Sequence, residues 1–391
     1  MPTPANSRRK IAAPSEEHSE KSSSLQEFAG NSLLYLYLSI ITTTMTINFK
    51  IAEFDFLTAP QAHWDAFFEH IDEIRRETDP EEPIMPREKR QAMSIKAGHS
   101  PYMNSHMFLL FPDDAPGAAA GFANVVVETP RSPSFATNSH IGNMHALSIS
   151  KNYRGLGLGT ALLEHVKEVL AVKEPTVTEL IAGAVLESGR GFLEAAGATL
   201  SLESAENRLA LKDVDWAMVE RWAAEGGAKN PGAVIKTVPV IPEEDIKEFC
   251  EVYSETNNQQ PLGDVKIDIR VTPEQIRYME QQDLEKGLEQ TTMYAKESDG
   301  RISGLTEIMY FKDLGHRAGQ MLTGVRPKYR GRGLGKLLKA LMLLHVRAHY
   351  PGVKYIVTGN ADSNAPMMAI NNQLGFKRHL AIKFYKLKLR R

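Results

Sequence analysis

The feature that most constrains this chain is an internal repeat. Residues 150–159 (SKNYRGLGLG) are matched by residues 326–335 (RPKYRGRGLG), and the shared arginines, Arg154 and Arg330, lie 176 positions apart. That offset is the length of a domain and is too long for one unit of a solenoid. The 391-residue chain is therefore predicted to contain two copies of one domain.

Each copy of the repeat lies between a predicted strand and a predicted helix. The preceding apolar runs are short enough for strands, and leucine and valine recur afterwards at helical spacing. An amphipathic helical stretch lies further upstream in each half. These segments are 145–149 and 321–325 for the strands, 158–169 and 334–344 for the following helices, and 61–77 and 243–256 for the upstream helices.

A cluster of Gly, Pro and Asn at 226–232 marks the predicted junction between the two units. We expect an N-terminal unit at 45–212, a helical connector and linker at 213–232, and a C-terminal unit at 233–391. Residues 1–44 are rich in Ser and Ala, and we expect a disordered extension that lacks the pattern of a signal peptide.

Composition excludes several classes of protein. The single cysteine, Cys250, rules out internal disulfides and cysteine-rich metal sites, and favours a reducing, cytoplasmic setting. The 46 basic residues nearly balance the 48 acidic ones, so a nucleic-acid partner is not expected. No apolar run is long enough to span a membrane. The twelve histidines form no paired ligand pattern, so no metal site is expected.

Glycines that join a strand to a helix present free backbone N–H groups to a phosphate. A P-loop would need Ser or Thr after Gly335-Lys336, where Leu337 stands. A dinucleotide-binding turn would need a third glycine where Leu338 and Leu162 stand. The pattern that fits both copies is Arg-x-x-Gly-x-Gly opening a helix.

This pattern resembles the GNAT superfamily of acyl-coenzyme A dependent N-acetyltransferases, in which the turn holds the coenzyme A pyrophosphate. The resemblance implies a mixed α/β class: two tandem GNAT folds, each a twisted, mostly antiparallel sheet flanked by helices. The two-unit arrangement is similar to that of mycothiol synthases, without implying their substrate. Acetyl-CoA is the implied cosubstrate, and its implied binding residues are Thr323, Val325, Arg330, Gly331, Arg332, Gly333, Leu334, Gly335, Lys336, Asn360, Asn364, Ile149, Arg154, Gly155, Gly157 and Gly159.

The second unit carries more of the family pattern. Residues 364–376 resemble a later family segment, in which an Asn opens a helix that ends in Leu-Gly-Phe. Asn364 and Asn360 would bond the pantetheine arm, although capping the helix explains Asn364 equally well. The matching segment of the first unit, 186–198, lacks that Asn. We therefore expect catalysis in the second unit, with the first as scaffold, substrate wall or cofactor sensor.

The distribution of basic residues also favours the second unit as the one that binds the cosubstrate. Six basic residues without an intervening acid surround the second turn and favour capture of an anionic cosubstrate, or else form a solvated basic face. They are Arg326, Lys328, Arg330, Arg332, Lys336 and Lys339.

Acetyl transfer to an amine needs a base for the ammonium proton. Glu307, an acid in an otherwise apolar strand, is the first choice, although the outer face of a strand also accepts Glu. His145 is the candidate in the first unit, where an ordinary strand histidine is the alternative. The family commonly places a Tyr as general acid where this chain has Asn371; Tyr294, Tyr310 or a water would then substitute.

The predicted function is transfer of an acetyl group from acetyl-CoA to a primary amine of a small molecule by direct attack. The alternatives are a non-catalytic acyl-CoA binding or sensing protein, and a peptide or protein N-acetyltransferase. Three acids would attract the amine or form a solvated helix face, namely Glu251, Glu255 and Asp264. The sequence predicts no oligomeric state.

Overall fold

The computed structural model describes residues 47–389, so the predicted disorder of residues 1–44 lies outside the described residues. The first half of the chain forms the elements β1 (Phe49–Glu53), α1 (Gln61–Thr78), α2 (Arg87–Ala97), β2 (Met103–Pro112), β3 (Gly121–Glu128), α3 (Phe135–Asn138), β4 (Ile141–Ile149), α4 (Leu158–Lys173), β5 (Glu179–Ala184), α5 (Glu187–Ala195) and β6 (Thr199–Ala210).

The second half repeats this order, without a counterpart of the short helix α3, after a connecting helix, α6 (Trp216–Lys229). Its elements are β7 (Val234–Val238), α7 (Ile246–Asn258), α8 (Pro273–Glu285), β8 (Leu288–Lys296), β9 (Ile302–Phe311), β10 (Arg317–Val325), α9 (Leu334–His349), β11 (Tyr355–Ala361), α10 (Ala365–Leu374) and β12 (Lys377–Lys388). The expected helices at 61–77 and 243–256 correspond to α1 and α7, whereas α2 and α8 were not predicted.

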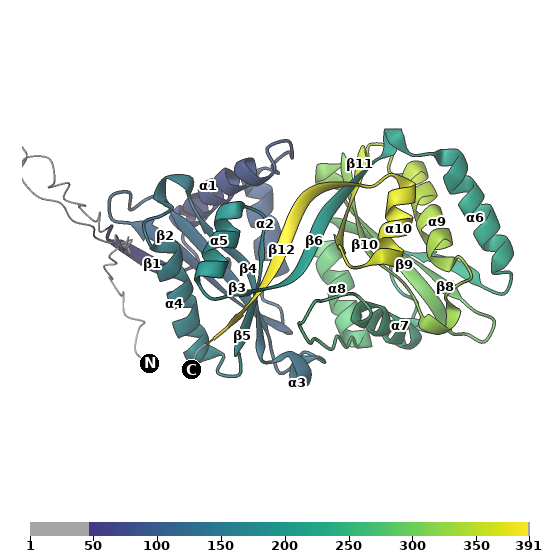
Figure 1. The fold of residues 1–391 in the computed structure, drawn as a ribbon, viewed down its shortest axis with the longest axis horizontal. Coiled ribbons are helices and arrows are strands. Elements are labelled where there is room, and N and C mark those ends of the chain that lie inside the picture. The colour runs from purple at the N-terminus through teal and green to yellow at the C-terminus, as the bar shows by residue number, and fades with distance from the viewer. Residues whose placement is uncertain (1–46, 390–391) are drawn as a thin grey trace, which may run out of the picture.

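Within residues 47–389 the strands form one twelve-stranded sheet in the order β1-β2-β3-β4-β5-β12-β6-β11-β10-β9-β8-β7 (Figure 1). The pairs β4–β5 and β10–β11 are parallel. The other strand pairs of these residues are antiparallel. The predicted fold class, a mixed α/β fold with mostly antiparallel sheets flanked by helices, is confirmed.

The two units exchange their last strands. β12, from the C-terminal half, lies between β5 and β6, and β6, from the N-terminal half, pairs with β11 (Figure 1). The pairing of β12 with β5 runs from Lys383–Ala184 to Lys388–Glu179. Each half of the sheet is therefore completed by a strand from the other half of the sequence.

The connecting helix α6 packs on α9 and contributes to the core of the second unit. Val219 is fully buried there, and a Cβ atom added at Gly226 would lie 2.7 Å from the Cβ of Leu337. Glycine at 226 thus permits the close approach of two helices. Asn230, at the end of α6, donates a hydrogen bond to the carbonyl of Arg332 in the second glycine turn.

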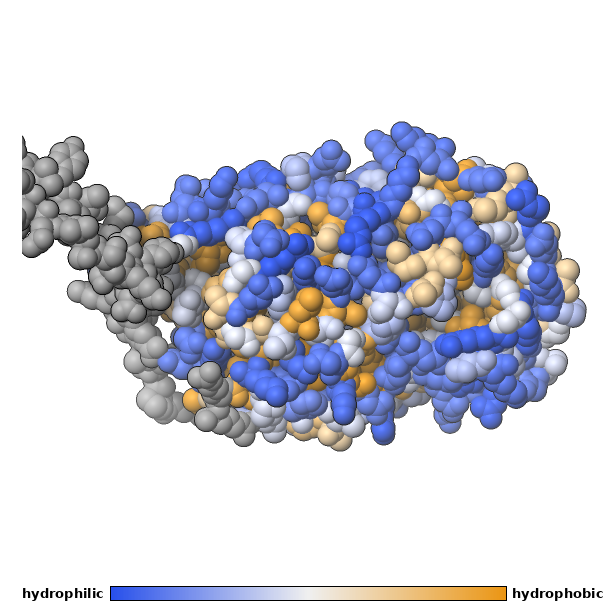
Figure 2. Space-filling model, viewed as in Figure 1, coloured by the Kyte–Doolittle hydropathy of each residue, from blue (hydrophilic) through white to orange (hydrophobic). Residues whose placement is uncertain are grey.

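Buried apolar residues cover both faces of each half of the sheet. In the first half one cluster lies under α4 and the other, rich in aromatic rings, lies under α1. In the second half the clusters lie under α9 and α7. Hydrophilic side chains cover much of the face seen in Figure 2. In residues 47–389 no helix combines the length and the apolar character needed to cross a membrane.

Loops from each unit contact the other. After α1, the buried side chain of Glu82 accepts hydrogen bonds from Tyr355 and His316 and pairs with Arg317 at 3.1 Å. In the opposite direction, the segment between α7 and α8 contacts the first unit, where the backbone N–H of Asp268 donates to Asn138. Together with the packing of α2 on α8, these contacts hold the two units against each other.

Candidate active site

Two glycine turns connect a strand to a helix in the way the repeat predicts. Gly157 and Gly333 precede the first residues of α4 and α9, with φ of 77° and 75°. Gly155 and Gly331 also have positive φ. A Cβ atom added at Gly155, Gly331 or Gly333 would meet nothing within 4 Å, so the backbone conformation is what requires glycine there.

The turns leave room for an anionic ligand. The first N–H groups of α4 and α9 have no partner within their helices and lie at the positive end of the helix dipole. Leu334 is buried as the first residue of α9, whereas Gly331 and Gly333 are exposed. Gly335 and Gly159 lie in the first helical turns, where Ile370 and Phe192 are their neighbours. The residues present fit the phosphates of coenzyme A.

The arginine of each turn binds back to the preceding strand. Arg154 Nε donates to the carbonyl of Ile149 over 2.9 Å, and Arg330 Nε donates to the carbonyl of Val325 over 3.1 Å. The two arginines differ in their remaining contacts. Arg154 forms a two-point ion pair with Glu77, whereas Arg330 donates to the neutral Gln259. The second turn therefore keeps more of its positive charge for a ligand.

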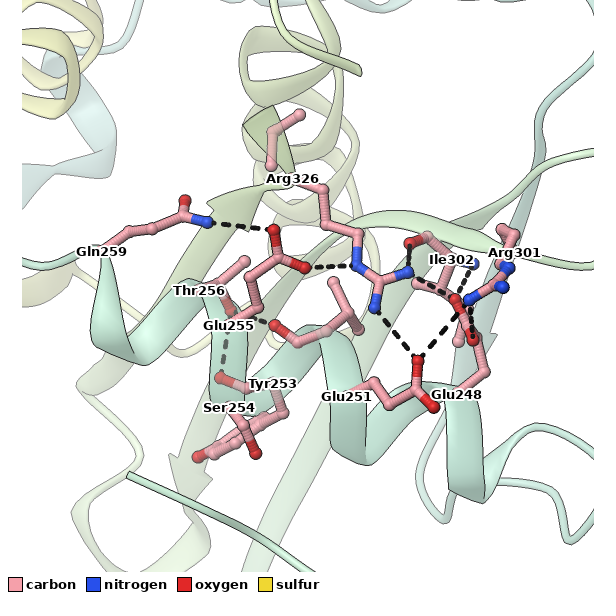
Figure 3. Close-up of polar contacts among 12 residues, drawn as sticks. Glu248, Glu251, Tyr253, Ser254, Glu255, Thr256, Gln259, Arg301, Ile302 and Arg326 are labelled. Carbon is pink, nitrogen blue, oxygen red and sulfur yellow. Dashed lines mark hydrogen bonds and ion pairs between the residues drawn. The ribbon is translucent and has the colours of Figure 1, made fainter. Parts of the chain in front are cut away.

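The basic cluster of the second turn is only partly available. Arg326 contacts three carboxylates of α7, those of Glu248, Glu251 and Glu255 (Figure 3). Arg332 pairs with Glu297 at 3.0 Å, so its backbone rather than its guanidinium remains at the turn. Lys339 is buried within the unit. Of the six basic side chains expected to be available to an anionic ligand, three are therefore engaged or buried and three remain.

The three remaining cations have no carboxylate partner within residues 47–389. Lys328 is exposed and lies over the ring of Tyr329, and Lys336 donates to Gln373 and lies 4.5 Å from the centre of the Trp222 ring. Arg330 is the third. These side chains supply the positive charge at the second turn.

A cavity of about 490 Å³ opens beside the first turn. Pairing between β4 and β5 ends at Met144 and Ala182, although both strands continue, and the cavity lies beyond that point. Its lining is largely apolar and includes Arg154, Gly157 and Phe192. The first unit thus has a glycine turn that adjoins a cavity between two parted strands.

In the second unit the side chain of Asn360 on β11 contacts the buried side chain of Asn371 on α10. Pairing of β10 with β11 ends at Gly319 and Val357. Beyond it, Asn371 donates to Asn360 over 2.6 Å and accepts from Lys339 over 2.9 Å. Asn364 caps α10, because its side chain accepts from the backbone N–H of Met367. Asn360 and Asn371 are therefore brought together, and Asn364 has the capping role.

Glu307, the predicted base, lies on β9 and lines a cavity of about 780 Å³ between the two units. Its side chain is nearly fully buried. The carboxylate accepts hydrogen bonds from Gln290 at 3.0 Å and Thr292 at 3.4 Å, both on the adjacent strand β8. Burial raises the pKa of Glu307 to about 8, against the smaller lowering effect of these hydrogen bonds.

A break in strand pairing lies directly opposite Glu307. The register between β9 and β10 shifts between Gln320 and Thr323. Met321, in that shift, is exposed and lines the same cavity. A bulge of this kind leaves backbone groups of a strand unpaired and re-aims its side chains. Thr323 bonds the hydroxyl of Thr306, and Val325 ends the strand at the turn.

Two cavity residues were missed by the sequence analysis. Tyr253 on α7 lines the cavity, and the charge of Glu307 together with burial raises its pKa. Asp283 on α8 is half-buried there, and burial raises its pKa. Nothing in the sequence singled out either residue, because α8 carries no family motif and its position depends on packing.

The remaining candidates lie in other surroundings. Tyr294 donates to Asp245 in a separate buried cluster, and Tyr310 stacks on Tyr350. His145 is exposed at the matching bulge of β4. In the first unit Asn124 accepts from Ser105 where Glu307 accepts from Gln290, so the neutral Asn124 takes the place of Glu307.

The acids expected to attract an amine are engaged elsewhere. Glu251 and Glu255 contact Arg326, and Asp264 pairs with Lys386 and accepts from Ser201. They do not line the cavity that contains Glu307.

One group in residues 47–389 has the spacing of a metal site, and it consists of Asp79, Glu206 and His379. Arg208 donates to both carboxylates of this group. A cation therefore already balances the charge of these acids.

Comparisons with known proteins agree with this geometry. The Acetyltransferase (GNAT) family profile matches residues 64–183 and 258–376, more than half of the chain. A tandem GNAT protein from the clavulanic acid biosynthesis pathway superposes with a TM-score of 0.65 at 19% identity, over 88% of this chain and 99% of its own.

Two further solved structures share the fold. A GCN5-related N-acetyltransferase from Sphaerobacter thermophilus gives a TM-score of 0.56 at 18% identity, over 88% of this chain and 96% of its own. The glucosamine N-acetyltransferase region of a fungal multi-domain beta-N-acetylglucosaminidase gives a TM-score of 0.57 at 14% identity, over 87% of this chain and 38% of its own. Among curated proteins, none matches the sequence. The chain belongs to the acetyltransferase (GNAT) family and carries two GNAT folds in tandem.

Proposed function

We propose that this protein transfers an acetyl group from acetyl-CoA to a primary amine of a small molecule, with the second unit as the catalytic one. The observation that carries the proposal is the position of Glu307, which is buried, has a raised pKa and lines a cavity of about 780 Å³. A carboxylate with a pKa near the working pH is suited to general-base catalysis.

The walls of the cavity favour a small acceptor. Helices α1 and α2 of the first unit contribute Phe68 and Met93, and α8 of the second contributes Met279. A volume of this size suits a compact organic molecule. Residues of both units line this side of the second unit.

Glu307 removes the ammonium proton of the acceptor. A free amine with a pKa near 10 is largely protonated at neutral pH, so only a small fraction is nucleophilic. Glu307 takes that proton with the carboxylate that Gln290 and Thr292 orient. The neutral amine then attacks the acetyl carbon directly, without a covalent enzyme intermediate; the C–S bond of the thioester breaks, and coenzyme A leaves as the thiolate, which takes up a proton.

The cosubstrate supplies the activated thioester when bound. The backbone N–H groups that follow Gly333, together with Lys328, Arg330 and Lys336, are the groups we assign to its phosphates. Unpaired backbone groups of β10 near the bulge, around Thr323, are assigned to the acetyl oxygen. Asn371 has no ionisable proton, so we assign it a positioning role rather than the role of a general acid for the departing thiolate.

The test is thiol release from acetyl-CoA, followed continuously in the presence of a panel of primary amines. We expect slow release without an acceptor and acceleration by at least one amine. Tight binding of acetyl-CoA without any accelerated release would support the alternative of a non-catalytic binding or sensing protein.

The first unit is proposed as a second acyl-CoA site. Its support is the cavity of about 490 Å³ beside Gly157. The ion pair between Arg154 and Glu77 reduces the positive charge there, so the affinity is expected to be lower than at the second turn. Titration calorimetry of the whole chain is expected to give two acetyl-CoA sites of unequal affinity, and one site would contradict this assignment.

A further inference from the structure

The cavity that contains Glu307 also has a cationic wall. Arg75 on α1, Arg90 on α2 and Arg317 on β10 all line it. Arg90 pairs with Asp72 at 2.6 Å, and Arg317 pairs with Glu82 at 3.1 Å. Those carboxylates balance two of the three charges.

Within the described part of the chain, Arg75 is the one of the three without a direct ion pair. It is half-buried, and among residues 47–389 its side chain has neither a hydrogen bond nor an ion pair. Burial, with Arg317 and Arg90 nearby, lowers the pKa of Arg75 against the smaller opposing effect of the Glu82 and Asp72 charges. The buried Nε of Arg90 also lacks a hydrogen-bond partner. Buried guanidinium donors without a partner, as on Arg75 and Arg90, are unfavourable unless a further anion accepts from them.

Charge is distributed unevenly around the cavity. Arg75 and Arg90 come from helices of the first unit, whereas the cavity acids Asp283 and Glu307 come from the second. The lining also includes apolar side chains, among them Phe67 and Phe311. Lys286 and Arg317 of the second unit also line the cavity, so the second unit contributes both signs of charge, whereas α1 and α2 contribute cations without a carboxylate.

We propose that the acceptor amine also carries an anionic group, a carboxylate or a phosphate, and that Arg75 binds this group while the amine faces Glu307. This inference rests on the proposed function for the role of Glu307. It names the class of acceptor as an amino acid-like or amino phosphate compound with an apolar body. The first unit then supplies a specificity residue to the active site of the second.

Kinetics with matched acceptors test the proposal. Two pairs differ by the anion alone: ε-aminocaproate against hexylamine, and phosphoethanolamine against ethanolamine. We expect the wild type to prefer the anionic member of at least one pair, which also distinguishes carboxylate from phosphate. Arg75→Gln is expected to raise KM for that member by roughly ten- to hundredfold, the usual contribution of a charge-assisted hydrogen bond, and to leave KM for the neutral member unchanged.

Arg76→Gln is the matched control, because Arg76 is the next residue of α1 and is exposed. It is expected to change neither KM. Loss of discrimination in both variants, or in neither, would overturn the assignment of Arg75. Because Arg75 has no partner to lose, Arg75→Gln is expected to fold with a melting temperature at or above that of the wild type.

A binding measurement separates failure of this inference from failure of the proposed function. Inorganic phosphate and ε-aminocaproate are expected to raise the melting temperature of the wild type and of Arg76→Gln more than that of Arg75→Gln. If no amine accelerates thiol release but this difference holds, the proposed function fails and the anion site stands. If release is accelerated and the difference is missing, the anion site fails.

Discussion

Lys339 donates a hydrogen bond of 2.9 Å to the side-chain oxygen of Asn371, and both residues are almost completely buried. The ring of Phe376 lies 5.4 Å from the Lys339 nitrogen. Burial lowers the pKa of Lys339 to about 7. A lysine from the basic segment of the second turn is thus part of the interior, at the position where Asn371 replaces the tyrosine of the family pattern.

The first prediction concerns stability against pH. Between pH 7 and 10 the unfolded chain holds the Lys339 proton while the folded chain has released it, so the unfolded state binds more protons. The free energy of unfolding therefore rises with pH in this window, by up to about 1.4 kcal/mol per pH unit from this group. Lys339→Met is expected to remove that slope in urea unfolding measured at several pH values.

Lys336→Met serves as the control, since Lys336 lies on the same helix and is not fully buried. Effects of Glu307 on the slope are common to all three proteins and cancel in the comparison. An unchanged slope in Lys339→Met would show that Lys339 is charged in the folded protein.

The second prediction separates structural from ligand-binding charges. Arg326→Gln leaves Glu248, Glu251 and Glu255 on α7 without their shared cation, so we expect the free energy of unfolding to fall by about 2 kcal/mol. Lys328→Gln is expected to leave stability unchanged within about 0.5 kcal/mol and to raise KM for acetyl-CoA, more strongly at low salt. A loss of stability in Lys328→Gln, with a raised KM for acetyl-CoA but unchanged stability in Arg326→Gln, would contradict these assignments.

The third prediction addresses the glycine turns. Gly333→Asp places a carboxylate where phosphate is expected to bind, and it forces a residue with a side chain to adopt a φ of 75°, which is unfavourable. We expect this variant to lose the tighter acetyl-CoA site in calorimetry. Gly157→Asp is expected to abolish the weaker site only. Gly300→Asp is the control, because Gly300 has a φ of 85° in the turn between β8 and β9. Full binding by Gly333→Asp would refute the assigned turn.

The fourth prediction follows from strand exchange. A fragment of residues 1–212 lacks β12, and a fragment of residues 213–391 lacks β6. Each would expose an unpaired strand edge, which promotes aggregation. We expect each fragment to be insoluble when expressed alone, and co-expression to restore a soluble complex. Two separately folded, monomeric fragments would contradict the exchanged pairing.

The local features of this structure could be predicted from the sequence. The spacing of Arg330, Gly333 and Gly335 predicts a strand, a turn and a helix, and β10 and α9 lie there. Glu307 was identified because a lone acid in an apolar strand needs a reason to be there, and the structure buries it beside a cavity.

Long-range features were not accessible in the same way. Alternation of apolar residues marks β12 as a strand without naming β5 and β6 as its partners. Arg75, Arg90 and Arg317 belong to three elements distant in sequence, and only the packing of the units brings them to one cavity. Lys339 was grouped with the surface charges because its helix was expected to have a face in solvent. In the structure, Lys339 is among the buried residues of that helix.

The fifth prediction tests the central claim, that Glu307 is the base. With the best amine acceptor, kcat/KM of the wild type is expected to rise with pH towards about 8, as Glu307 loses its proton. Glu307→Gln keeps the shape of the side chain but cannot accept the proton. We expect its kcat to fall by about 100-fold or more. Glu289→Gln, at an exposed neighbouring position of β8, is the control and should behave like the wild type.

The most direct measurement is therefore the pH profile of amine-dependent thiol release for the wild type, Glu307→Gln and Glu289→Gln. The account predicts that Glu307→Gln alone loses both the rate and the part of the profile that rises towards pH 8. A wild-type rate and profile in Glu307→Gln would contradict it.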